Sequence, residues 1–213
     1  HRDVMERITQ ISLNSASIEE LLGRVLDEML TVFNADRAYF LYSCDPDAPS
    51  WSVPMERTRP EWPGAFARGM VIPMTPETAE VFRELLASTK PLPYGPAASR
   101  CIPAAVAEQF SVRSLIQMAL PPKVGSPWVI GLHHCAQACA YDEDDLLIFG
   151  DIGLRVADAL SSMIILKNLR ASEENLSRAQ AVGQVGSWLL DIPTNRLEWS
   201  AETYRIFGIP QQE

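Results

Sequence analysis

From about Asp142 to Gln184 the sequence has the pattern of one long amphipathic helix. It opens with four consecutive acidic residues, Asp142 to Asp145, and carboxylates are favoured at a helix N-terminus, where unpaired N–H groups and the positive end of the dipole lie. Apolar residues follow at alternating steps of four and three, which places on one face Ile152, Val156, Ala159, Met163 and Leu166. A second stripe contains Leu160, Ile164 and Leu169. The pattern predicts that one stripe covers the preceding domain, that the other meets a partner, and that the helix mechanically couples one domain to the next.

The preceding residues alternate between helical and strand patterns. Helices are predicted over 4–13, 18–33, 76–88 and 103–109, with Ser17 and Glu20 forming a capping box and Thr75 capping the helix that Pro76 begins. Strands are predicted over 38–42, 51–57, 112–120 and 128–135, and residues 90–100 are expected to form a loop. Pro54 indicates an edge strand or a bulge in the second strand.

This order of elements predicts an α+β fold with a central antiparallel sheet. The terminal helices are expected to pack on one face of the sheet. The segment 58–110 should cover the other face and a pocket beneath it, because long irregular connections inside a compact domain are often binding lids. Within strand 112–120, alternation places Leu115, Gln117 and Ala119 on one face and Ile116, Met118 and Leu120 on the other.

Composition excludes several classes of protein. The net charge of −9 argues against a nucleic-acid partner, because phosphate contacts need clustered Lys and Arg. No apolar run reaches the roughly 20 residues of a membrane span, and no signal peptide is recognisable, so we expect no membrane insertion and a cytoplasmic location. Reduced thiols are expected for the four cysteines. Because the chain begins at His1, without an initiator Met, we expect it to be a piece of a longer protein.

Four segments of the first three quarters of the chain form an ordered set: Asn34–Ala38 before the first strand, Glu108–Leu115 before the third, and Trp128–Leu132 followed by Tyr141–Leu147. Together they resemble a GAF domain. The resemblance covers roughly residues 4–165 and implies a GAF-like sensory domain over 1–165.

A second set of motifs lies in the tail, at Ala179–Trp188, Asp191, Leu197–Ser200 and Glu202–Ile209. These residues resemble the start of a PAS domain. We expect a helical linker over 166–183 and an N-terminal PAS fragment over 184–213, because a whole PAS fold needs about a hundred residues.

Cys101 is the residue that a photoreceptor hypothesis would use. GAF domains of phytochromes and related photoreceptors attach a bilin through a cysteine in this region, before a short helix and a strand. Here the cysteine is followed by Ile102, where those proteins have histidine, and their upstream aspartate motif is not recognisable. The resemblance therefore implies bilin attachment at Cys101 as one hypothesis, against a small apolar residue at a helix start.

His133 and His134 form the other conspicuous pair, with Cys135 and Cys139 nearby. Imidazole and thiolate are metal ligands, but adjacent residues on a strand point to opposite faces. We therefore expect no metal site, with one histidine facing the pocket and the other lying beneath the terminal helices.

Large apolar residues and a few polar ones are the candidates to line a ligand pocket, although ordinary core packing is the commoner role of such apolar residues. These pocket candidates are Trp51, Trp62, Phe66, Tyr94, Phe110, Arg113, Gln117, Met118, His133 and His134. No catalytic triad, phosphate loop or paired-carboxylate motif is present, so no catalytic residue is predicted and the cofactor is unknown.

The resemblance implies a non-catalytic sensory or regulatory module of a bacterial signal-transduction protein. The parent would be a histidine kinase of a two-component system, or a diguanylate cyclase or phosphodiesterase. We expect a homodimer through the N- and C-terminal helices, and a small-molecule ligand or a conformational signal as input. The alternatives are a ligand-free dimerisation module and a bilin-binding photoreceptor module.

Overall fold

The computed structural model describes residues 1–210. They divide into two compact units, the first covering His1–Met163 and the second beginning at Ile164. The elements of the first unit are α1 (Arg2–Asn14), α2 (Ile18–Val32), β1 (Arg37–Tyr42), β2 (Ser50–Thr58), β3 (Val71–Pro73), α3 (Pro76–Ala87), β4 (Leu92–Tyr94), α4 (Ala104–Phe110), β5 (Ser114–Leu120), β6 (Trp128–His134) and the beginning of α5 (Glu143–Gly183).

The strands of the first unit form one six-stranded sheet in the order β3-β2-β1-β6-β5-β4, and every pair in it is antiparallel. The predicted α+β fold with a central antiparallel sheet is confirmed. The expectation of a loop over 90–100 is wrong, because β4 adds an edge strand there that pairs with β5. Two prolines, Pro91 and Pro93, concealed it, and proline is tolerated at a sheet edge.

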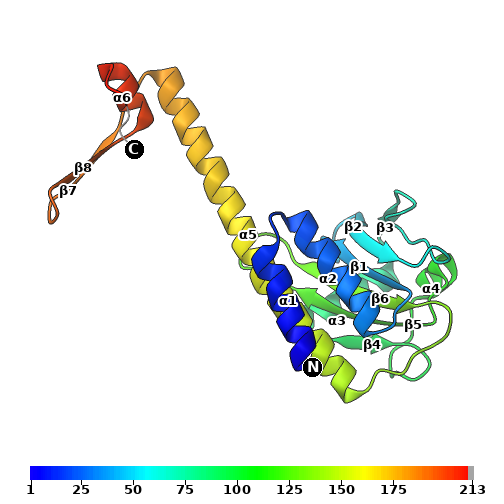
Figure 1. Cartoon of the computed structure of the whole chain (residues 1–213). Coiled ribbons are helices and arrows are strands. Elements are labelled where there is room, and N and C mark those ends of the chain that lie inside the picture. Colours follow the sequence, from blue (N-terminus) through cyan, green and yellow to red (C-terminus); the bar gives the residue numbers. More distant parts are fainter. Residues whose placement is uncertain (211–213) are drawn as a thin grey trace. The chain divides into compact units, whose positions relative to one another are not determined.

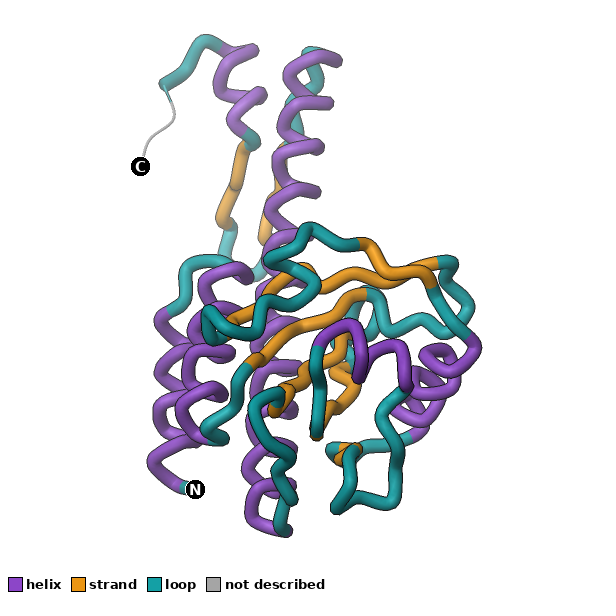
Figure 2. The backbone as a smooth tube through the Cα atoms, turned by 90° about the vertical axis from the view of Figure 1, so that its right-hand side faces the viewer, coloured by secondary structure: helices purple, strands orange, loops and turns teal. Residues whose placement is uncertain are grey.

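Two apolar layers cover the two faces of the sheet, as predicted (Figures 1 and 2). One layer packs α1, α2 and the beginning of α5 against one face, and it includes Phe40, Met118 and Ile130 of the strands. The other layer lies between the opposite face and the segment that contains α3 and α4, and it includes Trp51 and Phe82. The alternation predicted for β5 is observed, with Leu115 and Ala119 in this second layer and Ile116, Met118 and Leu120 in the first.

Side chains cap the helices much as the sequence predicts. The Ser17 hydroxyl accepts a hydrogen bond from the Glu20 N–H, while the Glu20 carboxylate accepts from the N–H of Ala16, one residue before the amide expected. Thr75 caps α3, which begins at Pro76. The carboxylates of Asp142 and Asp145 each accept from the other residue's N–H at the start of α5.

Helix α5 confirms the long helix predicted from about 142 to 184, but its buried face differs from the predicted stripes. The side chains of Phe149, Ile152, Val156 and Leu160 are buried in the core. Leu160 therefore belongs with the core-facing stripe, because it lies three helical turns from Phe149 and on the same side of the helix. Leu166 and Leu169 are about half exposed.

The second unit contains the end of α5, the antiparallel hairpin of β7 (Trp188–Asp191) and β8 (Arg196–Trp199), and α6 (Ala201–Phe207). Ser200 caps α6, and Gly208 ends it with a positive φ of 66°. Residues 211–213 of the predicted PAS fragment lie outside the described residues, and the assignment of 184–213 to a PAS domain stays a prediction. No helix within residues 1–210 is long and apolar enough to cross a membrane.

Candidate functional site

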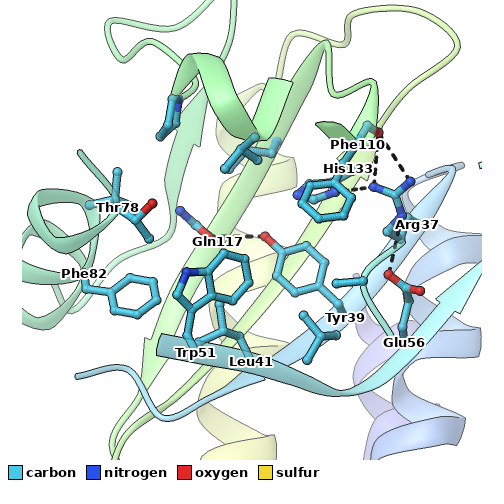
Figure 3. Close-up of a pocket in the computed structure, with 16 residues that line it drawn as sticks. Arg37, Tyr39, Leu41, Trp51, Glu56, Thr78, Phe82, Phe110, Gln117 and His133 are labelled. Atoms are coloured by element: carbon cyan, nitrogen blue, oxygen red, sulfur yellow. Dashed lines mark hydrogen bonds and ion pairs between the residues drawn. The ribbon is translucent and has the colours of Figure 1, made fainter. Parts of the chain in front are cut away.

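A small cavity of about 60 Å³ lies between the sheet and the α3–α4 layer. Strands β1, β2, β5 and β6 supply one wall, and α3, α4 and the segment after β2 supply the other (Figure 3). Most of the lining is apolar. Its polar and charged members are Arg37, Tyr39, Trp51, Glu56, Thr78, Gln117 and His133.

The Tyr39 side chain lies over the neighbouring strand β6, on the face of the sheet that lines this cavity. Tyr39 on β1 pairs with Gly131 on β6, and Gly131 pairs in turn with Gln117 on β5. A Cβ at position 131 would lie 2.5 Å from the Tyr39 Cζ and Oη atoms, so glycine leaves the space in which the ring lies. The Tyr39 hydroxyl thereby reaches Gln117, to whose Oε1 it donates over 3.2 Å. Burial raises the pKa of Tyr39 far above its usual value, so the phenol is a neutral donor.

Arg37 organises the opposite end of the cavity. Its guanidinium donates to the Trp62 carbonyl over 2.7 Å and lies 3.5 Å from Glu56. It also donates from Nη1 to His133 Nδ1 over 2.9 Å. Because arginine can only donate, His133 Nδ1 must accept, and the neutral imidazole therefore carries its proton on Nε2. Burial, with the Arg37 charge adding to it, holds the pKa of His133 well below its usual value.

Glu56 is the counter-charge to Arg37 and is itself buried. Its carboxylate also accepts from the Ala67 N–H over 3.4 Å, which ties the segment after β2 to the sheet. A Cβ at Gly64 would overlap this carboxylate, so glycine permits the close approach of that segment. Burial raises the pKa of Glu56, while Arg37 opposes the rise.

Four of the predicted pocket residues line the cavity, namely Trp51, Phe110, Gln117 and His133. Tyr94 packs in the same layer, with its hydroxyl 3.5 Å from the Glu84 carboxylate. Trp62 contributes its backbone carbonyl to Arg37.

The structure places the other predicted pocket residues elsewhere. Met118 lies in the helix layer, because its neighbour Gln117 faces the cavity and strand residues alternate. His134 also faces the helix layer, with its ring nitrogens 3.2 Å from the Phe33 carbonyl and 3.0 Å from the Tyr141 hydroxyl.

Phe66 and Arg113 are likewise outside the cavity. The Phe66 side chain is 48% exposed on the turn after Gly64. Arg113 is exposed just before β5, where its backbone N–H bonds the His134 carbonyl. Phe66 lies in a turn. Arg113 was predicted inside the strand 112–120, on the face of Leu115 and Gln117, but β5 begins only at Ser114, so this alternation does not apply to Arg113.

The sequence analysis missed Arg37, Tyr39 and Glu56. Two signals pointed to the first two of these residues: a charged residue, Arg37, at the start of an apolar strand, and an isolated glycine in the middle of the apolar strand 128–135, beside which Tyr39 lies. The second signal is typical of close approach by another group.

Cys101 is an exposed free thiol in the loop between β4 and α4, two residues before Pro103, which lines the cavity. Cys135 is buried, and its thiol lies 3.7 Å from the Phe110 carbonyl. Among residues 1–210, no three His, Cys, Asp or Glu side chains come together as metal ligands.

No protein-family model matches the sequence, and no curated protein matches it. Solved structures do. The structure of JSC1_58120g3 in its far-red absorbing dark state, with bound biliverdin IXα, has a TM-score of 0.64 and 12% identity, and the match covers 75% of this chain and 98% of that one. The phycocyanobilin-bound GAF domain of a cyanobacterial phytochrome has a TM-score of 0.62 and 18% identity, covering 77% and 95%. The chromophore-binding domain of a Stigmatella aurantiaca phytochrome has a TM-score of 0.59 and 13% identity, covering 76% and 59%.

These identities are low, so the likeness concerns the fold. The similar structures share with this chain the antiparallel sheet and the helices that cover it. The chain therefore has a GAF-like fold.

Proposed function

We propose that this chain is a non-catalytic sensory module of a signal-transduction protein. A small molecule enters the cavity, and α5 carries the resulting change onward. The observation that carries the proposal is that cavity and helix lie on opposite faces of the same strand. In β5, Gln117 faces the cavity and Met118 packs on α5.

Met118 contacts α5 directly. A Cβ at Gly153 would lie 2.9 Å from the Met118 Sδ atom, so the Met118 side chain lies against the helix where glycine has no side chain. Protein interiors are close-packed and have low compressibility, so a shift of β5 at Gln117 displaces its neighbours across the sheet. A ligand changes the balance of two such states only if it binds them with unequal affinity.

The ionisable groups that line the cavity support a binding role over catalysis. Burial and Arg37 keep His133 neutral, and burial keeps Tyr39 protonated. Arg37 is held by Glu56, by His133 and by backbone carbonyls. No nucleophile lies beside a base among the residues described as lining the cavity.

A bilin-binding photoreceptor is the second candidate, and the solved structures of similar fold favour it because they include domains with bound biliverdin, phycocyanobilin and phycoerythrobilin. The cavity residues do not fit that group. Pockets for drug-sized ligands measure roughly 300–1,000 Å³, against about 60 Å³ here. Among the described residues that line the cavity, Arg37 is the only cation, and its hydrogen bonds are already committed, so none is free for bilin propionates.

A ligand-free dimerisation module is the third candidate. Leu13 on α1 and Leu154 on α5 are large apolar side chains left exposed in the first unit. Self-association through the terminal helices fits each of these candidates. A histidine kinase, diguanylate cyclase or phosphodiesterase as parent, a PAS domain as the next module, and a cytoplasmic location remain part of the proposal.

The test is a thermal-shift screen with small metabolites, cyclic nucleotides and biliverdin, because a ligand that prefers the folded state raises Tm. Two variants in one segment form a matched pair: Ala65→Val fills the cavity, whereas Ala67→Val changes an exposed position. Adding a sensed ligand should raise the Tm of the wild type and of Ala67→Val. The Tm of Ala65→Val should be the same with and without the ligand.

Hydrogen exchange then tests transmission. A ligand that satisfies the screen should also change the protection of amides in α5 between Phe149 and Leu160, across the sheet from the cavity. Ligand protection confined to the cavity residues would contradict the proposed relay. A new absorbance band after expression with a bilin supply would favour the photoreceptor instead.

A further inference from the structure

The indole N–H of Trp51 has no hydrogen-bond partner. Trp51 is only 8% exposed, and its Nε1 is the one buried side-chain polar atom without a partner among residues 1–210. Buried donors are nearly always paired, and an unpaired one is costly, so each exception calls for an explanation. Trp51 lines the cavity, and Figure 3 shows its nitrogen on the ring edge that faces Gln117 and Thr78.

The neighbouring side chains do not supply the missing acceptor. The Gln117 Oε1 atom accepts from Tyr39, and the Thr78 hydroxyl lies 3.0 Å from the Thr75 hydroxyl, but neither oxygen makes a hydrogen bond with the Trp51 Nε1 atom. The Trp51 ring itself is held by an edge contact with Phe82, with ring centroids 6.3 Å apart. The donor is therefore fixed in place and directed into the cavity.

The charges around the cavity favour a neutral ligand. Arg37 and Glu56 compensate each other at 3.5 Å, and His133 and Tyr39 are neutral. A charged ligand would lose its hydration without meeting a free counter-charge, which is strongly unfavourable.

The size and walls of the cavity narrow the ligand further. A volume of about 60 Å³ compares with roughly 10–15 Å³ of probe-occupied volume for one water, so the space holds about four to six water-sized groups. The walls that complete it are apolar and include Leu41, Val53 and Val81.

We propose that the cavity binds a small, neutral, mostly apolar carbonyl compound whose oxygen accepts a hydrogen bond from the Trp51 indole N–H. This inference rests on the proposed sensory function and names the class of ligand. A carbonyl oxygen satisfies the donor without bringing a proton of its own.

The test uses the full chain labelled with ¹⁵N at its indole nitrogens. 2-Butanone is the probe, its hydrocarbon isostere 2-methyl-1-butene removes the acceptor, and propionate adds a charge. Titrations run through the micromolar and millimolar range, because ligands of this size bind no tighter than micromolar. Trp51→Phe removes the N–H and assigns its resonance, while Trp188→Phe, at an exposed position of the second unit, is the matched control.

We expect 2-butanone to move the Trp51 indole proton downfield in a saturable manner, and to bind Trp51→Phe about tenfold more weakly than Trp188→Phe. The isostere should bind the wild type and Trp51→Phe equally. Equal affinity of 2-butanone for both variants, or an indole resonance that it does not move, overturns the inference.

The outcomes also separate this inference from the proposed function. If another compound of the screen raises Tm in the wild type and in Trp51→Phe alike, but not in Ala65→Val, the module senses a ligand and the carbonyl class is wrong. If no compound distinguishes Ala65→Val from Ala67→Val, both proposals fail.

Discussion

Replacing Gly131 by alanine tests whether the position of the Tyr39 ring depends on the absence of a side chain at residue 131 of β6. The added Cβ would lie 2.5 Å from the Tyr39 Cζ and Oη atoms and 2.9 Å from Cε2. Real Cβ contacts of this kind do not occur, so the ring must move. The ring cannot move and keep its hydrogen bond to Gln117, because that bond requires it to cross Gly131.

The cost follows from two losses and one gain. Overpacking a buried site costs about 1–3 kcal/mol, and losing the Tyr39–Gln117 hydrogen bond costs about 1 kcal/mol. Replacing glycine within a strand returns roughly 0.5–1 kcal/mol, because glycine loses more backbone entropy on folding. Gly131→Ala should therefore lower the free energy of unfolding by about 1–3.5 kcal/mol.

Urea unfolding followed by circular dichroism measures this change, and a double-mutant cycle isolates its cause. In a Tyr39→Val background no ring lies above position 131, so Gly131→Ala should cost less than about 0.5 kcal/mol or become stabilising. Gly150→Ala is the control, because its Cβ would meet only Pro91 at 3.4 Å; it should stabilise α5 by about 0.5–1 kcal/mol. An equal cost of Gly131→Ala in both backgrounds would refute the reasoning.

Three further predictions concern charge and association. Because the pKa of His133 is lowered in the folded state, the unfolded chain binds a proton below about pH 6.5 at a site where the folded chain does not. The free energy of unfolding should therefore fall by about 1.4 kcal/mol for each pH unit below that value. Urea titrations of His133→Gln should lack this contribution to the pH dependence. Arg37→Met leaves Glu56 buried without a partner and should cost about 3–5 kcal/mol, partly restored when Glu56→Gln is added, as Tm would show. Leu166→Glu, at a half-exposed position, should weaken self-association in analytical ultracentrifugation without lowering Tm. Leu160→Glu, at a buried position, should instead unfold the chain. Unchanged association in Leu166→Glu would contradict dimerisation through α5.

The sequence predicted most of the fold because local rules act within each element. Alternation in β5 correctly separated Gln117 from its neighbours, and Thr75 and Pro76 correctly marked the start of α3. The same alternation, applied consistently, would have excluded Met118 from the pocket. Helical periodicity found α5 but not the side on which Leu160 lies, because a helix with apolar residues on two sides does not reveal which side meets the sheet.

Strand β2 shows why the site was harder to predict than the fold. Alternation from Trp51 placed Met55 on the same face and Glu56 on the other. The pairing of β1 with β2 instead shifts register between Phe40 and Tyr42, beside Pro54, as the predicted bulge would require. An inserted residue reverses the facing of all that follow. Glu56 therefore faces the cavity, where it pairs with Arg37. Pro54 indicated an edge strand or a bulge, but it did not show which of the two occurs, and only the bulge turns Glu56 toward the cavity.

The two close approaches at glycines suggest how the cavity and α5 are connected. Tyr39 reaches Gln117 only because Gly131 has no side chain, and Met118 reaches α5 only because Gly153 has none. Gln117 and Met118 are consecutive in β5, so they point in opposite directions from adjoining backbone positions. We therefore expect a ligand that displaces the Tyr39–Gln117 pair to shift the backbone that also carries Met118, and with it the close approach of Met118 to α5 at Gly153. This shift is the coupling that the proposed relay requires.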